Sequence, residues 1–262
     1  GYKEAGSFDK SRINPKFGLR WSPTPTLAFR ATEVWTLKRA QVANATLEPT
    51  HVAGFGQFYD DLNGTTAVNR GIGVDWQPDA RTTLLAEVVH RKYERPRFNP
   101  DLVLDPVRET VIRAIANRTI GSRFAVGIEA TSDLYSRRQP FVAPGGTPDA
   151  VPLQVLTTAL SPSVRWFHDA GWFAISTVNV GRQRVVRDAF YTNQGTSNFE
   201  TLDLAAGWRR PGSASFVAIE VRNAFDRRFP FQDDSFRASE ARPDLVRFLP
   251  VRMLWVRAGL EF

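Results

Sequence analysis

The chain has 262 residues, of which 42% are hydrophobic and 23% charged, and its formal net charge is +7. It contains no cysteine, which excludes disulfides, thiolate metal sites and cysteine nucleophiles. Lys and Arg number 34 against 27 Asp and Glu, with the two signs interspersed, so a nucleic-acid partner is not expected.

Alternating apolar and polar residues recur in segment after segment along the chain, which is the period-2 pattern of β-strands. About twelve segments of roughly ten residues are visible, the length of a tilted membrane-spanning strand. Four further segments are expected as strands: TLAFRATEVWTLKR, HVAGFGQFYDD, LQVLTTALSPSVRWFHDAG and WFAISTVNVGRQRVV. In chain order, the apolar members of the clearest segments are Phe17, Leu19, Trp21; Ile72, Val74, Trp76; Leu84, Ala86, Val88; Ile112, Ala114, Ala116; Phe124, Val126, Ile128, Ala130; Leu202, Leu204, Ala206, Trp208; Val217, Ile219, Val221; and Leu254, Val256, Ala258, Leu260, Phe262.

The connections between these segments alternate in length. SPTPT, QPDAR, IGSR, HDAG and RRPGSA are short. The long ones are KRAQVANATLEPT, YERPRFNPDLVLDPVRE, YSRRQPFVAPGGTPDAVP, VVRDAFYTNQGTSN and FDRRFPFQDDSFRASEARPDLVRF. Tight turns at one end and longer loops at the other are typical of bacterial outer-membrane barrels. We therefore predict an all-β fold, an antiparallel up-and-down transmembrane β-barrel that forms one domain over residues 1–262.

The two faces of each segment have different expected surroundings in a barrel and in a soluble β-sandwich. In a sandwich the apolar face lies in the core, whereas in a membrane barrel it contacts lipid and the polar face lines the lumen. Small and charged residues opposite the apolar face, and Trp and Tyr near segment ends, favour the barrel. The charged residues expected in the lumen are Arg20, Asp75, Glu87, Arg113, Glu129, Asp203, Glu220, Arg222, Arg257 and Glu261.

Three stretches resemble bacterial outer-membrane proteins. The last strand, with Leu254, Val256, Ala258, Leu260 and Phe262 on one face, resembles the C-terminal signal that the barrel-assembly machinery recognises. FVAIEVRNAFDRRFPFQ is similar to the V-x-N-L-F-(D/N)-x-x-(F/Y) segment of TonB-dependent receptors, and INPKFGLRWSPTPTLAFRAT to their N-P-(K/R)-x-G-L-x-(Y/W)-x-P strand. The matching residues are Val221, Asn223, Phe225, Asp226 and Phe229 in the first, and Asn14, Pro15, Lys16, Gly18, Leu19, Trp21 and Pro23 in the second, with Ala224 in place of the usual Leu.

The resemblance implies a barrel in the outer membrane of a Gram-negative bacterium, in contact with lipid and lipopolysaccharide. TonB-dependent receptors have 22 strands and an N-terminal plug, and neither the plug nor so many strands is visible here. The chain is therefore expected to be either the C-terminal part of a longer protein or a small porin-like barrel. LEPTHVAGFGQFYDD is also similar to export barrels that follow tetratricopeptide repeats, so polysaccharide export is an alternative to uptake.

Residues capable of catalysis are few. The three histidines, His51, His90 and His168, are scattered and lack the spacing of a metal site or a catalytic triad, although Ser161 and Ser163 lie near His168 in sequence. The acidic pairs Asp60-Asp61 and Asp233-Asp234 suit calcium in outer loops, but solvated turns are the simpler interpretation. We predict no enzyme, no cofactor and no metal, and a transport barrel for a polar or anionic solute, with an outer-membrane enzyme or a soluble β-sandwich binding module as alternatives of another class.

Overall fold

The computed structural model describes residues 2–4, 8–38, 51–57, 61–98, 102–140, 142, 146–149, 151–192, 194–229, 231 and 252–261. These residues form an all-β, antiparallel fold, and no helix that could cross a membrane is present among them. The main sheet has eleven strands. They are β3 (Lys16–Thr24), β4 (Leu27–Leu37), β7 (Thr66–Asp79), β8 (Thr82–Phe98), β9 (Leu102–Ile120), β10 (Phe124–Arg137), β11 (Gln154–Phe167), β12 (Trp172–Val186), β13 (Gly195–Arg209), β14 (Phe216–Arg222) and β15 (Met253–Gly259).

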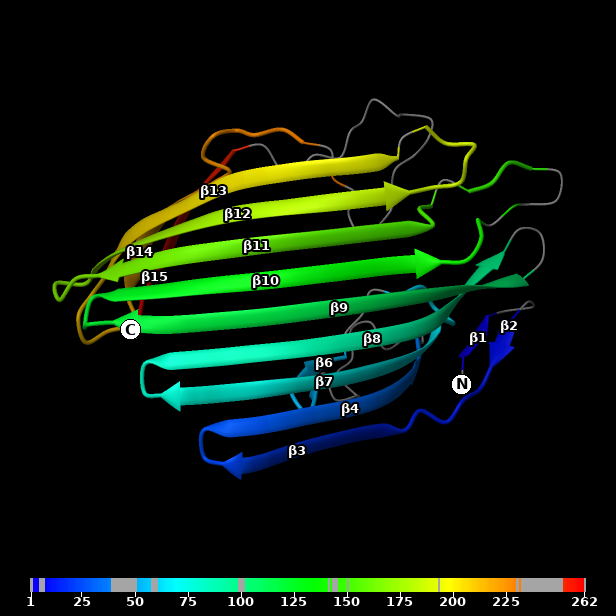
Figure 1. Cartoon of the computed structure of the whole chain (residues 1–262), viewed down its shortest axis with the longest axis horizontal. Helices are drawn as coiled ribbons and strands as arrows, with labels where there is room; N and C mark the ends of the chain where they lie inside the picture. The colour runs from blue at the N-terminus through cyan, green and yellow to red at the C-terminus, as the bar shows by residue number, and fades with distance from the viewer. Residues whose placement is uncertain are drawn as a thin grey trace.

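Two small hairpins accompany the main sheet. One pairs β1 (Tyr2–Glu4) with β2 (Phe8–Lys10), and the other pairs β5 (His51–Val52) with β6 (Phe55–Gly56). Within the main sheet each strand pairs with the next along the chain, apart from the β5–β6 insertion between β4 and β7. The result is the expected up-and-down meander (Figure 1).

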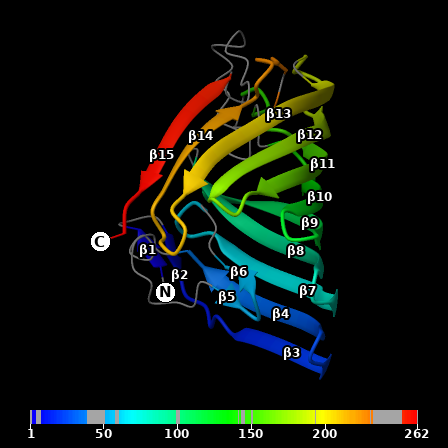
Figure 2. The ribbon, with the colours of Figure 1, turned by 90° about the vertical axis from the view of Figure 1, so that its left-hand side faces the viewer.

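The main sheet is strongly curved, with β3 and β15 at its two ends (Figure 2). Seen from the side, the β5–β6 hairpin lies on its concave side. Lys10 of β2 contacts Thr66 of β7 and Glu94 of β8. Among the described residues, β3 pairs only with β4 and β15 only with β14. The expected closure of the sheet into a barrel is therefore not observed.

Tight turns join the strands at one end of the sheet, as the short polar connections predict. Two residues separate β3 from β4, and two separate β7 from β8. At the same end Gly121, Gly171 and Gly212 have positive φ angles, which glycine adopts without the steric cost that other residues bear. The longer connections lie at the other end of the sheet (Figure 1).

Two local predictions were wrong. The stretch HVAGFGQFYDD does not add a long strand, because Ala53 and Gly54 take positive φ angles and fold it into the short β5–β6 hairpin. The stretch YERPRFNPDLVLDPVRE is not a long connection, because β8 continues to Phe98 and β9 begins at Leu102. Two of its three prolines fall within one continuous ladder, where Pro96 lies opposite Leu104 and Pro106 opposite Glu94, and Pro100 lies outside the described residues.

Pro162 also lies within a strand. The segment LQVLTTALSPSVRWFHDAG was expected as a strand, and β11 continues through this proline from Gln154 to Phe167. A proline donates no backbone hydrogen bond, and the pairing of β11 with β12 skips from Leu160 to Ser163. The strand thus accommodates the residue at the cost of a local gap in the ladder.

Candidate functional site: the concave face of the sheet

Residues that lie directly opposite each other on neighbouring strands project from the same face of a sheet. One such row crosses five strands through Arg20, Arg30, Gly73, Glu87 and Arg113. The β5–β6 hairpin packs against this face, so the row lies on the concave side (Figure 2). By the same register, all the strand residues expected in the lumen share the concave face: Arg20, Asp75, Glu87, Arg113, Glu129, Asp203, Glu220, Arg222 and Arg257.

The convex face carries the apolar members of the strands, and many of them are exposed. The exposed fraction is 65% for Ile72, 60% for Trp21 and 69% for Val256. A row through this face reads Trp21, Phe29, Val74, Ala86, Ala114, Ala130, Leu160 and Val180. Monomeric soluble proteins rarely expose a contiguous apolar surface of this extent. The apolar face, which a soluble protein buries in its core, is therefore the outward face of this sheet.

The apolar surface forms a belt with defined borders. On β10 it extends from Phe124 to Ala130, about 20 Å along the strand at the usual rise per residue. Toward the long-connection end the outward residues become charged: Glu33 on β4, Arg70 on β7, Lys92 on β8 and Arg182 on β12. At the short-turn end, outward-facing tryptophans border it: Trp21, Trp76, Trp166, Trp172 and Trp208.

Arg30 is the centre of an ion-pair network on the concave face. Its Nη2 donates to Glu87 Oε2 at 3.2 Å, and its Nε lies 2.8 Å from Asp75 Oδ2, in ion-pair range but outside hydrogen-bond geometry. The Arg30 side chain is only 5% exposed. Arg20 reaches the same Asp75 at 3.7 Å but is itself 60% exposed. Sequence reasoning named Arg20, Asp75 and Glu87 but missed Arg30, although its alternation with Phe29 and Ala31 was visible.

The β5–β6 hairpin is docked onto this network. Arg30 Nη1 donates to the Ala53 carbonyl at 3.4 Å, and the guanidinium lies over the Phe55 ring at 4.7 Å from the centroid. Glycines on the sheet make room for the hairpin: a Cβ on Gly71 would lie 2.9 Å from the Phe55 ring, and one on Gly18 would lie 2.8 Å from Val52 Cγ1. The hairpin therefore packs closely against the concave face over β3, β4 and β7.

Five of the other expected lumen charges have partners farther along the face. Arg113 Nε donates to Glu129 Oε1 at 2.8 Å, and Arg257 pairs with Glu220. Asp203 accepts hydrogen bonds from the Asn223 backbone at 2.8 Å and from Asn179 Nδ2 at 3.1 Å.

Glu261 lies beyond the end of β15 and caps a turn. It accepts hydrogen bonds from the Ala214 backbone at 2.6 Å and from Ser213 Oγ at 2.9 Å. These two donors, the Ala214 N–H first, hold the pKa of Glu261 below its usual range. In the C-terminal signal expected from sequence, Leu254, Val256 and Ala258 face outward on β15, and Phe262 lies outside the described residues.

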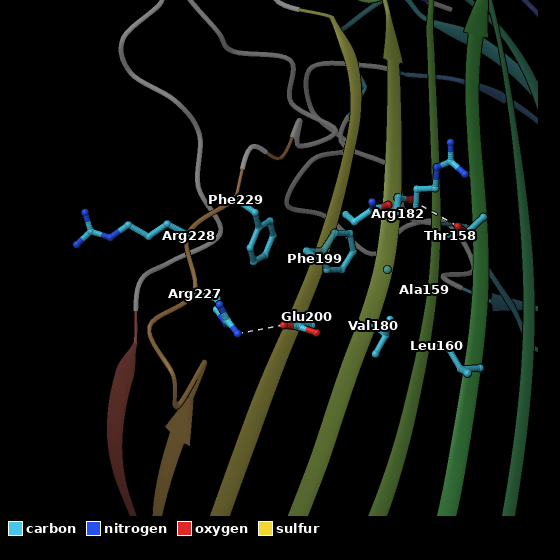
Figure 3. A pocket seen from close by; sticks show the side chains of 12 residues that line it. Thr158, Ala159, Leu160, Val180, Arg182, Phe199, Glu200, Arg227, Arg228 and Phe229 are labelled. Carbon is cyan, nitrogen blue, oxygen red and sulfur yellow. Dashed lines mark hydrogen bonds and ion pairs between the residues drawn. The ribbon is translucent and has the colours of Figure 1, made fainter.

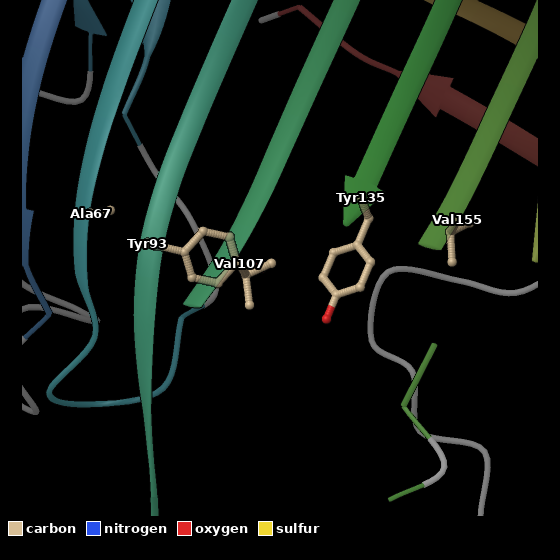
Figure 4. Packing of buried hydrophobic residues seen from close by; sticks show 5 residues of the cluster. All are labelled: Ala67, Tyr93, Val107, Tyr135 and Val155. Carbon is tan, nitrogen blue, oxygen red and sulfur yellow. The ribbon is translucent and has the colours of Figure 1, made fainter. Parts of the chain in front are cut away.

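A second network fills the concave face toward the long-connection end. Ala67, Tyr93, Val107, Tyr135 and Val155, from five successive strands, form a buried apolar cluster (Figure 4). Hydrogen-bonded and ion-paired side chains surround this cluster. Tyr93 donates to Glu109 at 2.6 Å, and Arg95 Nη2 lies 2.8 Å from Asp105 Oδ2. The sequence did not predict these ends of β8 and β9 as strand, because YERPRFNPDLVLDPVRE was interpreted as a loop.

Two buried arginines belong to this second network. The Arg91 side chain is 4% exposed and pairs with Asp61 and with Glu109, the latter at 3.2 Å. The Arg137 side chain is fully buried and pairs with Asp149 and with Asp105, the latter at 3.3 Å. Asp61, which the sequence offered as a calcium ligand, is thus paired with an arginine instead. Asp60, Asp233 and Asp234 lie outside the described residues.

An aromatic hollow lies beside β12 and β13. It has a volume of about 660 Å³. The Phe199 ring lies over Gly181, where an added Cβ would meet it at 2.1 Å, and stacks on Phe229 with centroids 5.0 Å apart (Figure 3). Arg227 pairs with Glu200 at 3.2 Å, and Arg228 points away from the ring pair (Figure 3).

The segment VRNAFDRRF, which carries the resemblance to TonB-dependent receptors, forms the turn that leaves β14. Asn223 takes a φ of 48° and is 5% exposed; its side chain accepts from the Arg227 backbone N–H at 2.9 Å and donates to the Arg227 carbonyl at 2.8 Å. Asp226 accepts from the Arg252 backbone at 2.9 Å. The motif residues thus connect β14 to the start of β15.

The histidines form no catalytic group in the described part of the chain. His90 Nδ1 lies 2.8 Å from Thr110 Oγ1, and His168 Nδ1 accepts from the Ala170 backbone at 3.1 Å within a turn. Among the residues that the structure describes, no three His, Asp or Glu side chains are grouped so that they could hold a metal ion. His51 lies in the β5–β6 hairpin.

The chain matches no protein-family model, and neither the curated proteins nor the solved structures give a significant match.

Proposed function

We propose that the chain is an outer-membrane β-barrel, or the part of one that these strands build, with its convex face toward lipid and its concave face toward a polar interior. The observation that carries the proposal is the inverted placement of polarity. Apolar side chains are exposed on the convex face, while the ion-paired Arg30, Asp75 and Glu87 lie on the concave face. In a soluble sandwich the apolar face would be covered by a second sheet, and the described residues contain none on that side.

The proposed role is passage of a polar solute across the outer membrane, in the manner of a barrel similar to TonB-dependent receptors. The concave face supports this role because it carries charges of both signs. These groups can bind a polar solute in place of the water molecules that hydrate it. The net charge of +7 favours an anionic solute. The docked β5–β6 hairpin narrows the space beside Arg30, so passage would be selective rather than open.

A second candidate is export of a polysaccharide. The aromatic hollow favours it, because stacked Phe199 and Phe229 offer flat apolar surfaces next to the small residues Ala159 and Gly181. Ligand sites commonly combine aromatic walls with a few polar groups, here the ion pair of Glu200 and Arg227. In this case a neutral oligosaccharide, rather than a small anion, would be the substrate.

Reconstitution in planar lipid bilayers tests the proposal. The account predicts a conductance that is absent from protein-free bilayers and that a permeating solute blocks. A small anion that blocks the current supports the first candidate, and a neutral oligosaccharide that blocks it supports the second. Protein that inserts into bilayers without conducting would contradict the passage role, and protein absent from the outer-membrane fraction of cells would contradict the membrane assignment.

A further inference from the structure

A basic hollow lies at the long-connection ends of β7, β8 and β9, and nothing in the proposed passage uses it. Its volume is about 810 Å³. A single carboxylate, that of Glu94, lines it. The basic residues that line it are Lys10, Arg12, Lys92, Arg108, Arg137 and Arg138, although the Arg137 side chain is buried on the concave side.

Only two of these cations are neutralised by carboxylates. Arg137 is paired with Asp105 and Asp149, and Lys10 lies 3.6 Å from Glu94. For the remaining four, Arg12, Lys92, Arg108 and Arg138, no ion pair occurs within the described residues. Arg12 instead lies over the Trp35 ring at 4.5 Å from its centroid.

The register places two of the cations against each other. Lys92 of β8 lies directly opposite Arg108 of β9. Like charges at directly opposed positions destabilise a sheet. Both side chains are exposed, so the arrangement leaves a concentrated positive potential that a bound anion would relieve.

The position of the pair relative to the apolar belt indicates where that anion comes from. Lys92 and Arg108 project from the convex face, and Lys92 is the second outward residue beyond Val88, with His90 between them. This distance is about 13 Å along the strand. If the belt contacts the acyl chains, the pair lies at the depth of the lipid headgroups.

We infer that this hollow binds the phosphate groups of an anionic lipid headgroup on the outside of the sheet, with Lys92 and Arg108 as the principal contacts and Arg12 and Arg138 beside them. The inference rests on the proposed function in one respect, the orientation of the convex face toward lipid. A lysine and an arginine side by side suit phosphate, since Arg offers a planar fork of donors and Lys a mobile point charge. A solute crossing the interior would not meet them.

The test uses the full-length protein in neutral detergent and measures its affinity for a fluorescent bisphosphorylated glycolipid, for the dephosphorylated glycolipid and for inorganic phosphate. The test variant is Lys92→Gln/Arg108→Gln. The control variant, Arg81→Gln/Arg210→Gln, removes the same charge from exposed turns at the opposite end of the sheet. Each basic residue near an anionic lipid surface contributes enough that losing two weakens binding by tenfold or more.

The inference predicts that the test variant binds the phosphorylated lipid at least tenfold more weakly than the wild type does. The control variant should bind it with an affinity within twofold of the wild type. The wild type should bind the phosphorylated lipid more tightly than the dephosphorylated form. An equal loss in both variants, or none in either, overturns it. Inorganic phosphate that binds as tightly as the phosphorylated lipid also overturns it in favour of a free-phosphate site. Binding is measured in detergent, so this test is separate from the conductance measurement. A test variant that conducts in bilayers and binds the phosphorylated lipid normally contradicts only this inference. Wild-type protein that fails to conduct contradicts only the passage role.

Discussion

Arg30 and Glu87 form an ion pair across an intervening strand. Arg30 projects from β4 and Glu87 from β8, and Arg30 Nη2 lies 3.2 Å from Glu87 Oε2 above Gly73 of β7. Gly73 leaves the space free: a Cβ there would lie 3.1 Å from Arg30 Nη2 and 3.3 Å from Glu87 Cβ. Three strands are thus joined on the concave face by side chains as well as by their backbone ladders.

Loss of the Arg30 guanidinium should destabilise the protein. In Arg30→Ala the carboxylates of Asp75 and Glu87 lose their buried cation, and we expect the free energy of unfolding in detergent to fall by about 3 kcal/mol. Arg20→Ala removes the same charge from an exposed side chain that reaches Asp75 at 3.7 Å, and should cost at most about 1 kcal/mol. Equal effects in denaturant titrations of the two variants would contradict the central role of Arg30.

Displacement of the β5–β6 hairpin should widen the passage. In Gly71→Val the new side chain meets the Phe55 ring, because even a Cβ would lie 2.9 Å from it, so the hairpin has to leave its site. Gly56→Val places the same side chain on the hairpin itself, where a Cβ meets nothing within 4 Å. We expect single-channel conductance to rise for Gly71→Val and to stay at the wild-type value for Gly56→Val. An unchanged conductance in both, with protein that folds normally, would show that the hairpin does not restrict passage.

Much of this architecture follows from period-2 alternation. The assignment of residues to two faces was predictable because a strand exposes alternate residues, and Ile72, Gly73 and Val74 already differ in polarity. The hairpin was not predictable, since HVAGFGQFYDD alternates like a strand until Ala53 and Gly54 adopt positive φ. Its docking depends on Gly71 and Arg30, which are distant in sequence from Phe55.

The candidate site was predicted only in part for a related reason. Asp75, Glu87 and Arg113 were named because each alternates with clear apolar neighbours. Arg91 and Arg137 were missed because their strands end in proline-bearing polar sequence that favours a loop. These residues are ordered by ion pairs to Asp61, Asp105 and Asp149, which are tertiary contacts that no local pattern encodes.

The turn after β14 should depend on the amide of Asn223. Asn223→Ala removes both side-chain hydrogen bonds to the Arg227 backbone and places alanine at a positive φ of 48°. We expect a loss of about 2 kcal/mol in the free energy of unfolding. Asn223→Asp keeps the acceptor for the Arg227 N–H and should lose less. If thermal or chemical denaturation ranks the two variants the other way round, the turn is not held by this amide.

A charge on the convex face should be costly only in lipid. Val256 is 69% exposed on that face of β15, so Val256→Arg in a water-exposed sheet would be nearly neutral. Against lipid we expect it to cost about 2 to 4 kcal/mol and to lower the yield of membrane-inserted protein. Arg257→Val, on the concave face beside Glu220, should be milder in the insertion assay. A reversal of the two effects would mean that the faces are assigned the wrong way round.

The most direct measurement of the central claim uses neighbouring residues of one strand. Because the chain has no cysteine, Ala130→Cys and Thr131→Cys each introduce a single thiol on β10, the first on the convex face and the second on the concave face. Each variant in lipid vesicles is treated with a water-soluble maleimide, and each is also labelled with a fluorophore and exposed to quenchers attached to lipid acyl chains. The account predicts that Thr131→Cys reacts with the maleimide and escapes the quenchers, while the fluorophore at Ala130→Cys is quenched by lipid and its thiol resists the maleimide. Equal aqueous reactivity of both thiols, with no quenching by lipid at either, would contradict it.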